Sequence, residues 1–156
     1  MRVIYPGSFD PPTRGHVDIA RRAAALYGDL VVVVMGNPDK GPGLSLERRA
    51  ALLDKCLAGT PGLRVQVYRG LLADAVKDLG ARAILRGLRD QGDYQAERPV
   101  ADGFLDLFGV ETVFMQCRPE LGYVSSSMAR QLLRLGGPAE GLLPEAIAQE
   151  IKSAYR

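Results

Sequence analysis

The stretch YPGSFDPPTRGH, residues 5–16, joins a short β-rich run to a segment whose apolar residues follow helical spacing. It ends in His16, the single histidine of the chain. Gly7 and Ser8 come directly after the predicted strand, and residues 10–13 have the composition of a turn. A strand that leads through a turn into a helix is the first step of a strand–helix alternation, which is typical of parallel sheets.

The same alternation continues along the rest of the chain. The predicted elements are strands at 3–5, 30–35, 63–68, 82–85 and 110–116, and helices at 17–27, 46–57, 71–79, 126–135 and 144–155. The run LVVVVM, residues 30–35, is typical of a strand buried on both faces. We therefore expect one α/β domain over residues 1–156, with a five-stranded parallel sheet and helices on both faces. Such sheets bind ligands at the carboxyl ends of their strands, where the strand order reverses.

Composition excludes several classes of function. A net charge of +2 gives no strongly basic surface for nucleic acid. The most apolar run is too short to span a bilayer, and a strand-like run begins at Arg2 instead of a signal segment. Cys56 and Cys117 lack the spacing of a metal or redox motif, which predicts two buried, reduced thiols. We expect a soluble cytoplasmic protein with no nucleic-acid or membrane partner.

The opening stretch contains the first cluster of candidate ligand-binding residues. Gly15 and His16 fall at the start of a predicted helix, where free N–H groups and a partial positive charge favour phosphate. Ser8 can donate its hydroxyl hydrogen and His16 a ring N–H, and the helix dipole favours the neutral imidazole. The alternative is a capped turn that contains a half-buried histidine.

Two further clusters and one lysine are also candidates for phosphate binding. RGLR places Arg86 and Arg89 after the strand predicted at 82–85, and planar guanidinium groups match phosphate oxygens. VSSS, residues 124–127, lies at the start of a predicted helix. One serine there is an ordinary N-cap, and three together can also form a phosphate-binding site. Lys40 lies in a glycine- and proline-rich loop and can add a cation over a triphosphate. The alternatives are a solvated turn, a simple cap and a solvated lysine.

These clusters are suited to positioning a phosphorylated substrate. No pattern of Asp, Glu and His indicates a metal cage, and no Ser–His–Asp or Cys–His set indicates covalent catalysis. Many side chains that can donate hydrogen bonds to phosphate, without a nucleophile, indicate phosphoryl or nucleotidyl transfer. Such an enzyme orients its substrates and stabilises developing charge.

In their order and spacing, YPGSFDPPTRGH, RGLR and VSSS resemble the motifs of the bacterial phosphopantetheine adenylyltransferases, members of the nucleotidyltransferase superfamily with a T-x-G-H motif. The likeness covers essentially the whole chain, including NPDK at 37–40 and FLDLFGVETVFM at 104–115. It implies a Rossmann-like nucleotidyltransferase fold, usually assembled as a homohexamer of two trimers. It also implies transfer of the adenylyl group of ATP to 4'-phosphopantetheine, giving dephospho-coenzyme A and pyrophosphate in coenzyme A biosynthesis. The resemblance further implies an in-line attack without a covalent intermediate, and inhibition by the product or by coenzyme A.

The resemblance further implies roles for individual residues. The catalytic residues are expected to be His16 at the α-phosphate, Lys40 at phosphates of both substrates and Arg89 at the ATP phosphates. The residues expected at phosphopantetheine are Ser8, Lys40, Leu71, Leu72 and Arg86. The residues expected at ATP are Ser8, Phe9, His16, Gly87, Arg89, Glu97, Ser125, Ser126 and Ser127, with Glu97 at the ribose. Mg²⁺ is expected to arrive on the ATP oxygens, without protein side chains as ligands.

Three places depart from the family pattern: residue 14, the segment around residue 99, and residue 131. Arg14 replaces a usual Asn and is expected to point to solvent. Pro99 and Gly103 interrupt a segment that is a continuous helix in the family, which predicts a kink or a late helix start near Arg98. Phe104 stands where the family tends to have Asn, so an altered pantetheine pocket is expected.

Two other functions remain open at this point. Gln131 replaces a common Glu, and Arg130 makes SSSMAR similar to the ending of pyridine-nucleotide adenylyltransferases. Nucleotidyl transfer to another phosphorylated acceptor, such as nicotinamide mononucleotide or glycerol phosphate, is therefore one alternative, although Thr13 and RGLR argue against it. The other alternative is a non-catalytic nucleotide-binding subunit, which would not need the histidine, the lysine and both arginines together.

Overall fold

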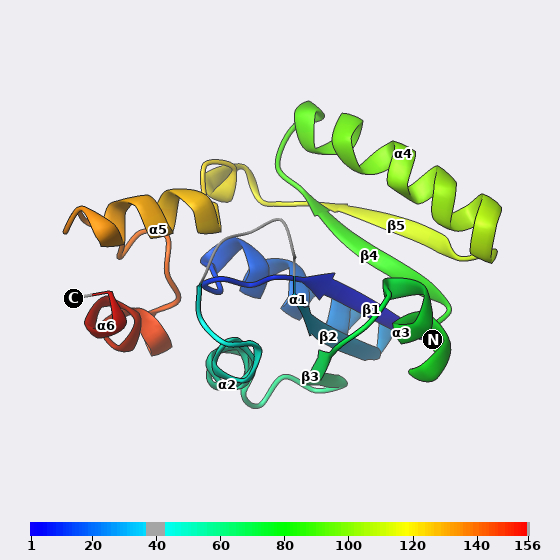
Figure 1. The fold of residues 1–156 in the computed structure, drawn as a ribbon, viewed down its shortest axis with the longest axis horizontal. Helices are drawn as coiled ribbons and strands as arrows, with labels where there is room; N and C mark the ends of the chain where they lie inside the picture. Colours follow the sequence, from blue (N-terminus) through cyan, green and yellow to red (C-terminus); the bar gives the residue numbers. More distant parts are fainter. Residues whose placement is uncertain (37–42, 156) are drawn as a thin grey trace.

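The sheet of this protein is parallel and has five strands, as the alternation of strands and helices predicts (Figure 1). The computed structural model describes residues 1–36 and 43–155. The strand order is β3-β2-β1-β4-β5. The strands are β1 (Arg2–Gly7), β2 (Asp29–Met35), β3 (Leu63–Tyr68), β4 (Ala83–Leu88) and β5 (Glu111–Gln116).

Helices cover both faces of the sheet, because successive side chains of each strand point to opposite faces. Val3 and Tyr5 of β1 belong to a large buried cluster, whereas Ile4 between them belongs to a second, smaller cluster. The helices are α1 (Arg14–Tyr27), α2 (Leu46–Leu57), α3 (Leu72–Asp78), α4 (Gln91–Phe108), α5 (Ser126–Arg134) and α6 (Glu145–Ala154). Residues of α1, α2, α5 and α6 pack into the large cluster, and residues of α3 and α4 pack into the smaller one.

The strand order reverses between β1 and β4. The chain builds β1, β2 and β3 outward to one edge and then crosses back to place β4 on the other side of β1. β1 pairs with β2 along its full length, but the pairing of β1 with β4 comprises Val3↔Ala83 and Ile4↔Ile84. The carboxyl halves of β1 and β4 therefore have room between them, at the position where such sheets bind ligands.

Outside α4, the predicted boundaries that are wrong by the most residues are the end of β4 and the start of α1. β4 continues to Leu88 instead of ending at residue 85, because its carboxyl half pairs with β5 through Arg86↔Phe114 and Gly87↔Met115. α1 begins at Arg14 instead of residue 17, because the Thr13 side chain caps the helix at that point.

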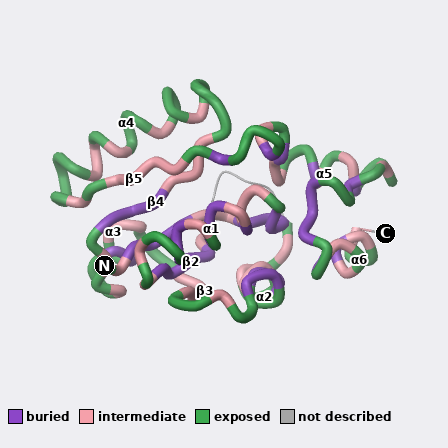
Figure 2. Tube along the Cα trace, turned by 180° about the vertical axis from the view of Figure 1, so that it is seen from behind, coloured by how far each residue is buried: buried purple, intermediate pink, exposed green. Residues whose placement is uncertain are grey.

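α4 (Gln91–Phe108) is one helix that contains Pro99, so the predicted late start near Arg98 is wrong. The Asp90 carboxylate caps the helix by accepting a hydrogen bond from the Asp93 N–H, at 2.9 Å. No residue of α4 is buried, and Figure 2 shows the helix as mainly exposed. Water can therefore satisfy the carbonyl that Pro99 leaves without an N–H partner, which lowers the cost of a proline inside a helix. A bend at Pro99 stays a prediction.

Two other expectations concern thiols and membrane spans. Cys56 and Cys117 are buried free thiols, as predicted. Burial raises the pKa of the Cys56 thiol to about 11, so it stays protonated and unreactive near neutral pH. Within residues 1–36 and 43–155, no helix combines the length and the apolar character that crossing a membrane requires.

Candidate active site

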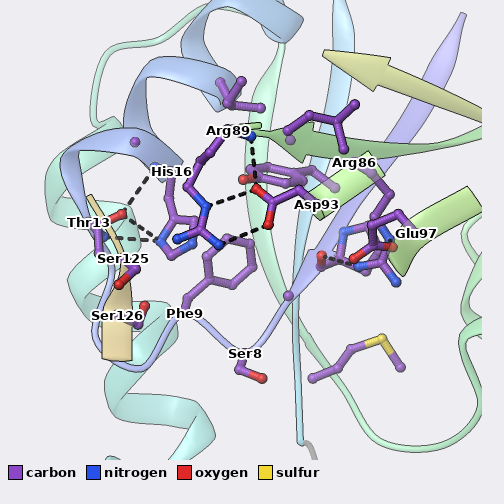
Figure 3. Close-up of a pocket in the computed structure, with 18 of the residues that line it drawn as sticks. Ser8, Phe9, Thr13, His16, Arg86, Arg89, Asp93, Glu97, Ser125 and Ser126 are labelled. Atoms are coloured by element: carbon purple, nitrogen blue, oxygen red, sulfur yellow. Dashed lines mark hydrogen bonds and ion pairs between the residues drawn. The ribbon is translucent and has the colours of Figure 1, made fainter. Parts of the chain in front are cut away.

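A cavity of about 680 Å³ opens at the carboxyl ends of β1 and β4 (Figure 3). Its wall contains residues from the β1–α1 loop, the end of β4, the start of α3, one face of α4 and the start of α5. The sequence-predicted site residues that line it are Ser8, Phe9, His16, Leu71, Leu72, Arg86, Gly87, Arg89, Glu97, Ser125, Ser126 and Ser127. Lys40 lies outside the described residues.

Thr13 and His16 form a reciprocal cap at the start of α1. The Thr13 hydroxyl oxygen accepts a hydrogen bond from the His16 backbone N–H at 3.3 Å, and the Thr13 backbone N–H donates to His16 Nδ1 at 3.1 Å. Because Nδ1 accepts a hydrogen bond, the proton of the neutral imidazole sits on Nε2. The cap therefore fixes both the ring orientation and the tautomer, and it makes Nε2–H a hydrogen-bond donor in the cavity wall.

The Phe9 ring packs against the His16 ring. It lies edge-to-face with the His16 ring, with centroids 4.9 Å apart, and with the Tyr5 ring at 5.4 Å. Phe9 has φ 48°, a left-handed conformation that costs a bulky residue about 1–2 kcal/mol. Buried packing holds Phe9 in this conformation, because its side chain is only 2% exposed. Backbone strain of this kind is common next to functional groups.

The two arginines of RGLR face the cavity and are each paired with a carboxylate of α4 (Figure 3). Arg86 Nε lies 3.1 Å from Glu97 Oε2, and Arg86 Nη1 donates to the Pro6 carbonyl across the gap between β1 and β4. Arg89 donates to Asp93 from Nε and Nη2 at 2.9 Å each, and its backbone N–H donates to the same carboxylate. These hydrogen bonds from Arg89 hold the pKa of Asp93 below its ordinary value.

The three serines before α5 already make hydrogen bonds within the protein. The Ser125 hydroxyl oxygen accepts from the Met128 N–H and caps α5. Ser126 donates its hydroxyl hydrogen to the Pro11 carbonyl at 2.8 Å, and Ser127 accepts from Arg130 at 3.3 Å. The serines therefore build the start of α5 and also line the cavity, and phosphate binding by them stays a prediction.

The positions that depart from the family pattern lie away from this cavity. Arg14 is exposed and donates to the Gly141 carbonyl at 3.0 Å, in agreement with the expected solvent-facing side chain. Gln131 is exposed, and Phe104 packs against the smaller buried cluster. Neither Phe104 nor Pro99 is among the described residues that line the cavity, and an altered pantetheine pocket stays a prediction.

Asp93 is a charged residue of the cavity wall that was not predicted from the sequence. It lines the wall beside Arg89 and holds that guanidinium from two sides. The spacing of four residues between Arg89 and Asp93 was the available signal, since residues four apart lie on the same face of a helix. Because the helix was predicted to start only near Arg98, residues 89 and 93 were not considered as neighbours on one helix face.

The described residues of the cavity offer hydrogen-bond donors for several phosphate oxygens, and no activated nucleophile is found among them. Two guanidinium groups, an imidazole N–H and the amino end of α1 converge on one cavity, a combination that suits a polyphosphate. Over the described ranges 1–36 and 43–155, no group of three or more His, Cys, Asp or Glu is arranged to hold a metal ion. Fold and cavity together define a protein of the nucleotidyltransferase class, which moves a nucleotidyl group without covalent attachment to the enzyme.

Comparison with known proteins agrees with this class. The family model described as cytidylyltransferase-like matches residues 4–132. A protein named phosphopantetheine adenylyltransferase from a Nocardioides species is 42% identical over 94% of this chain and 92% of its own length. Proteins of the same name from Corynebacterium glutamicum and Corynebacterium efficiens are 38% and 39% identical over 99% of this chain and 98% of theirs. The chain therefore belongs to the cytidylyltransferase-like family and, within it, to the phosphopantetheine adenylyltransferases.

Proposed function

We propose that this protein transfers the adenylyl group of ATP to 4'-phosphopantetheine and releases pyrophosphate. The full-length similarity to phosphopantetheine adenylyltransferases supports the reaction and its place in coenzyme A biosynthesis. The single observation that carries the proposal in this chain is the Thr13–His16 cap, because it fixes a neutral imidazole donor beside two arginines in one cavity. One domain, residues 1–156, then carries the whole reaction.

The transfer is a direct displacement at phosphorus. An oxygen of the acceptor phosphate forms a bond to the α-phosphorus of ATP, and the bond from that phosphorus to the bridging oxygen of pyrophosphate breaks. The electron pair of the broken bond leaves with pyrophosphate. His16 donates a hydrogen bond from Nε2 to a non-bridging α-phosphate oxygen, where negative charge develops in the transition state. Arg89 contacts the ATP phosphates, beside the start of α5.

The acceptor occupies the opposite side of the cavity. Arg86 binds the phosphate of 4'-phosphopantetheine, Ser8 orients that phosphate by its hydroxyl, and Leu71 with Leu72 lines the pantetheine arm. Both leucines line the cavity, and Leu71 is 69% exposed, which leaves an apolar surface for a ligand to cover. Lys40 is proposed to contact phosphates of both substrates.

Substrate binding exchanges the partners of the two arginines. Asp93 holds Arg89 and Glu97 holds Arg86, so each guanidinium is oriented before a phosphate arrives. A phosphate gives a guanidinium a partner of greater negative charge than a carboxylate. Glu97, released from Arg86, is then available to the ribose hydroxyl groups of ATP.

Mg²⁺ is the proposed metal, bound to ATP. The part of the cavity wall that the structure describes fits this mode, because its carboxylates, Asp93 and Glu97, are both engaged with arginines, whereas its donors suit phosphate oxygens. The ATP oxygens and water would hold the ion, which supplies charge neutralisation on the triphosphate.

A pyrophosphate-release assay tests the proposal. The purified protein with ATP, Mg²⁺ and 4'-phosphopantetheine should release pyrophosphate and give dephospho-coenzyme A, identified by its mass. Nicotinamide mononucleotide and glycerol phosphate serve as alternative acceptors, and CTP as an alternative donor. Release with one of these acceptors alone, or with no acceptor at all, would overturn the proposed substrate. Adding coenzyme A to the same assay tests product-type inhibition.

A homohexamer is the proposed assembly, and the cytoplasm the proposed location. The exposed large apolar side chains of α4, namely Tyr94, Val100, Leu105, Leu107 and Phe108, support self-association, because a second copy of the chain could cover them. Sedimentation equilibrium should give six times the 16.9 kDa mass of the chain. A monomer at all concentrations would rule out the assembly without affecting the proposed reaction.

A further inference from the structure

A buried ion pair joins the β1–α1 loop to α2. Arg49 of α2 and Asp10 of the loop approach to 3.4 Å, and their side chains are 12% and 6% exposed. No role is assigned to either residue in the reaction as described so far, and neither lines the cavity among the described residues.

Arg49 does more than neutralise Asp10. Its Nε donates to the Leu44 carbonyl at 2.6 Å, and its Nη1 donates to the Ser8 carbonyl at 3.2 Å. The Asp10 carboxylate in turn accepts from the Leu44 N–H at 3.1 Å. One guanidinium thus ties the main chain of the cavity loop at Ser8 to the main chain that leads into α2.

The loop is also held from its other side by α5. Arg130 donates to the Asp10 carbonyl at 2.6 Å, and Ser126 donates to the Pro11 carbonyl at 2.8 Å. Of these contacts, the Arg49 bond to Ser8 is the one that reaches the residue directly before Phe9, whose left-handed backbone carries strain.

A purely stabilising role does not explain this arrangement well. Buried ion pairs cost desolvation of both charges, and well-packed apolar residues often stabilise a fold equally well. What the charged pair supplies, and an apolar pair cannot, is a set of directed hydrogen bonds to three main-chain groups of Ser8 and Leu44. Directed bonds fix atomic positions, and errors of about 1 Å in a reacting group can reduce rates about 100-fold.

We propose that Arg49 and Asp10 are positioning residues of the transfer reaction. Through the Ser8 carbonyl they hold the Ser8–Phe9 main chain, so that the Ser8 hydroxyl meets the acceptor phosphate and the Phe9 ring supports His16. The inference rests on the proposed function, because it assumes the acceptor side assigned to Ser8.

The test compares the same substitution at two neighbouring arginines of α2. Arg49→Met removes the bridge, whereas Arg48→Met removes a surface ion pair with Glu150 and serves as the control. Steady-state pyrophosphate release is measured at a temperature where circular dichroism shows each variant folded. Arg49→Met should lower kcat about tenfold or more and raise the KM for 4'-phosphopantetheine more than the KM for ATP. Arg48→Met should stay within about twofold of the wild type.

The outcomes separate positioning from stability. A lower unfolding midpoint with unchanged kcat for Arg49→Met would show a merely structural pair and overturn the inference. Wild-type protein without transfer activity would instead overturn the proposed function, since that result does not involve Arg49.

If Arg49→Met does not fold, the same kinetic parameters are measured in Gly43→Ala and Asp10→Asn. A Cβ on Gly43 would lie 1.9 Å from Asp10 Oδ2, so the alanine must displace the carboxylate while both charges remain. Asparagine at position 10 keeps the acceptor for the Leu44 N–H and removes the charge opposite Arg49. Both variants should show the same pattern, a lower kcat with a preferential rise of the acceptor KM. Wild-type kinetics in both variants would overturn the inference.

Discussion

The two walls of the cavity are held in place by different forces. The β1–α1 wall contains Phe9 and Thr13, both buried, and a reciprocal cap fixes its histidine. The α4 wall has no buried residue, and ion pairs at its surface orient Arg86 and Arg89. The two walls therefore suit different tasks. The buried wall suits a group that must not move during the reaction, and the exposed wall suits groups that change partners when substrates arrive.

The largest effect is expected from His16→Ala, which removes the donor that the buried wall holds. Turnover should fall about 10³-fold, because one preorganised donor to a developing charge is worth that order of magnitude. The Kd of ATP, measured by calorimetry, should change only a few-fold, since the contact strengthens mainly in the transition state.

Arg14→Ala is the matched control for His16→Ala, since Arg14 lies in the same helical turn but faces away from the cavity. It should leave turnover unchanged. Loss of ATP affinity in parallel with turnover for His16→Ala would contradict the assigned role and remove the contrast between the walls.

A smaller effect is expected from Thr13→Val, which breaks one half of the reciprocal cap. The variant loses the hydroxyl that accepts from the His16 N–H but keeps the backbone N–H that bonds to Nδ1. Stability should fall by about 1 kcal/mol, as for other N-caps, and kcat by less than about tenfold. Urea unfolding and pyrophosphate release measure the two quantities.

Ser45→Ala sharpens this comparison, because Ser45 caps α2 in the same way but does not line the cavity. It should give a similar loss of stability with unchanged kcat. An equal kcat loss in both variants would mean that the cap acts through general stability alone.

On the exposed wall, Asp93→Asn should have a few-fold effect on the KM of ATP and little effect on kcat. The pair with Arg89 is partly exposed, so its contribution to stability should be below about 1 kcal/mol. Because Arg89 lowers the pKa of Asp93, this contribution is present above the ordinary carboxyl pKa near 4 and is lost as pH falls through the lowered value.

The difference in unfolding free energy between wild type and Asp93→Asn should therefore be constant from about pH 7 to pH 5 and shrink below about pH 4. Asp102→Asn is the control, since Asp102 pairs with Arg98 on the same helix away from the cavity. Loss of kcat in Asp93→Asn comparable to that of His16→Ala would show that the two walls are equally rigid in function.

The smallest effect is expected from Gly103→Ala on α4. No atom lies within 4 Å of a Cβ built at this position, so the substitution should follow helix propensity alone. The free energy of unfolding should rise by about 0.5–1 kcal/mol, with activity unchanged. A loss of stability in urea unfolding would indicate that a second copy of the chain covers this part of α4.

Much of the sheet and half of the cavity could be predicted from the chain itself. The continuous apolar run of β2 and the cap at Ser45 are local signals, and the structure places both elements where they indicate. His16, Arg86 and Arg89 were identifiable because parallel strands end at one edge of a sheet. Pro99 was misleading, because the penalty for a proline inside a helix depends on whether water reaches the freed carbonyl, and the exposure of α4 is not a local property.

The sequence by itself determined the order of strands and helices apart from α4, the turn chemistry at Thr13 and the residue types available for phosphate binding. Those features depend on neighbours within a few positions along the chain. Only the tertiary structure decided that β4 extends beside β5, and that Arg49 bonds to Ser8. These contacts join residues far apart in the sequence, and their energies depend on burial and direction, which a pattern of residue types does not contain.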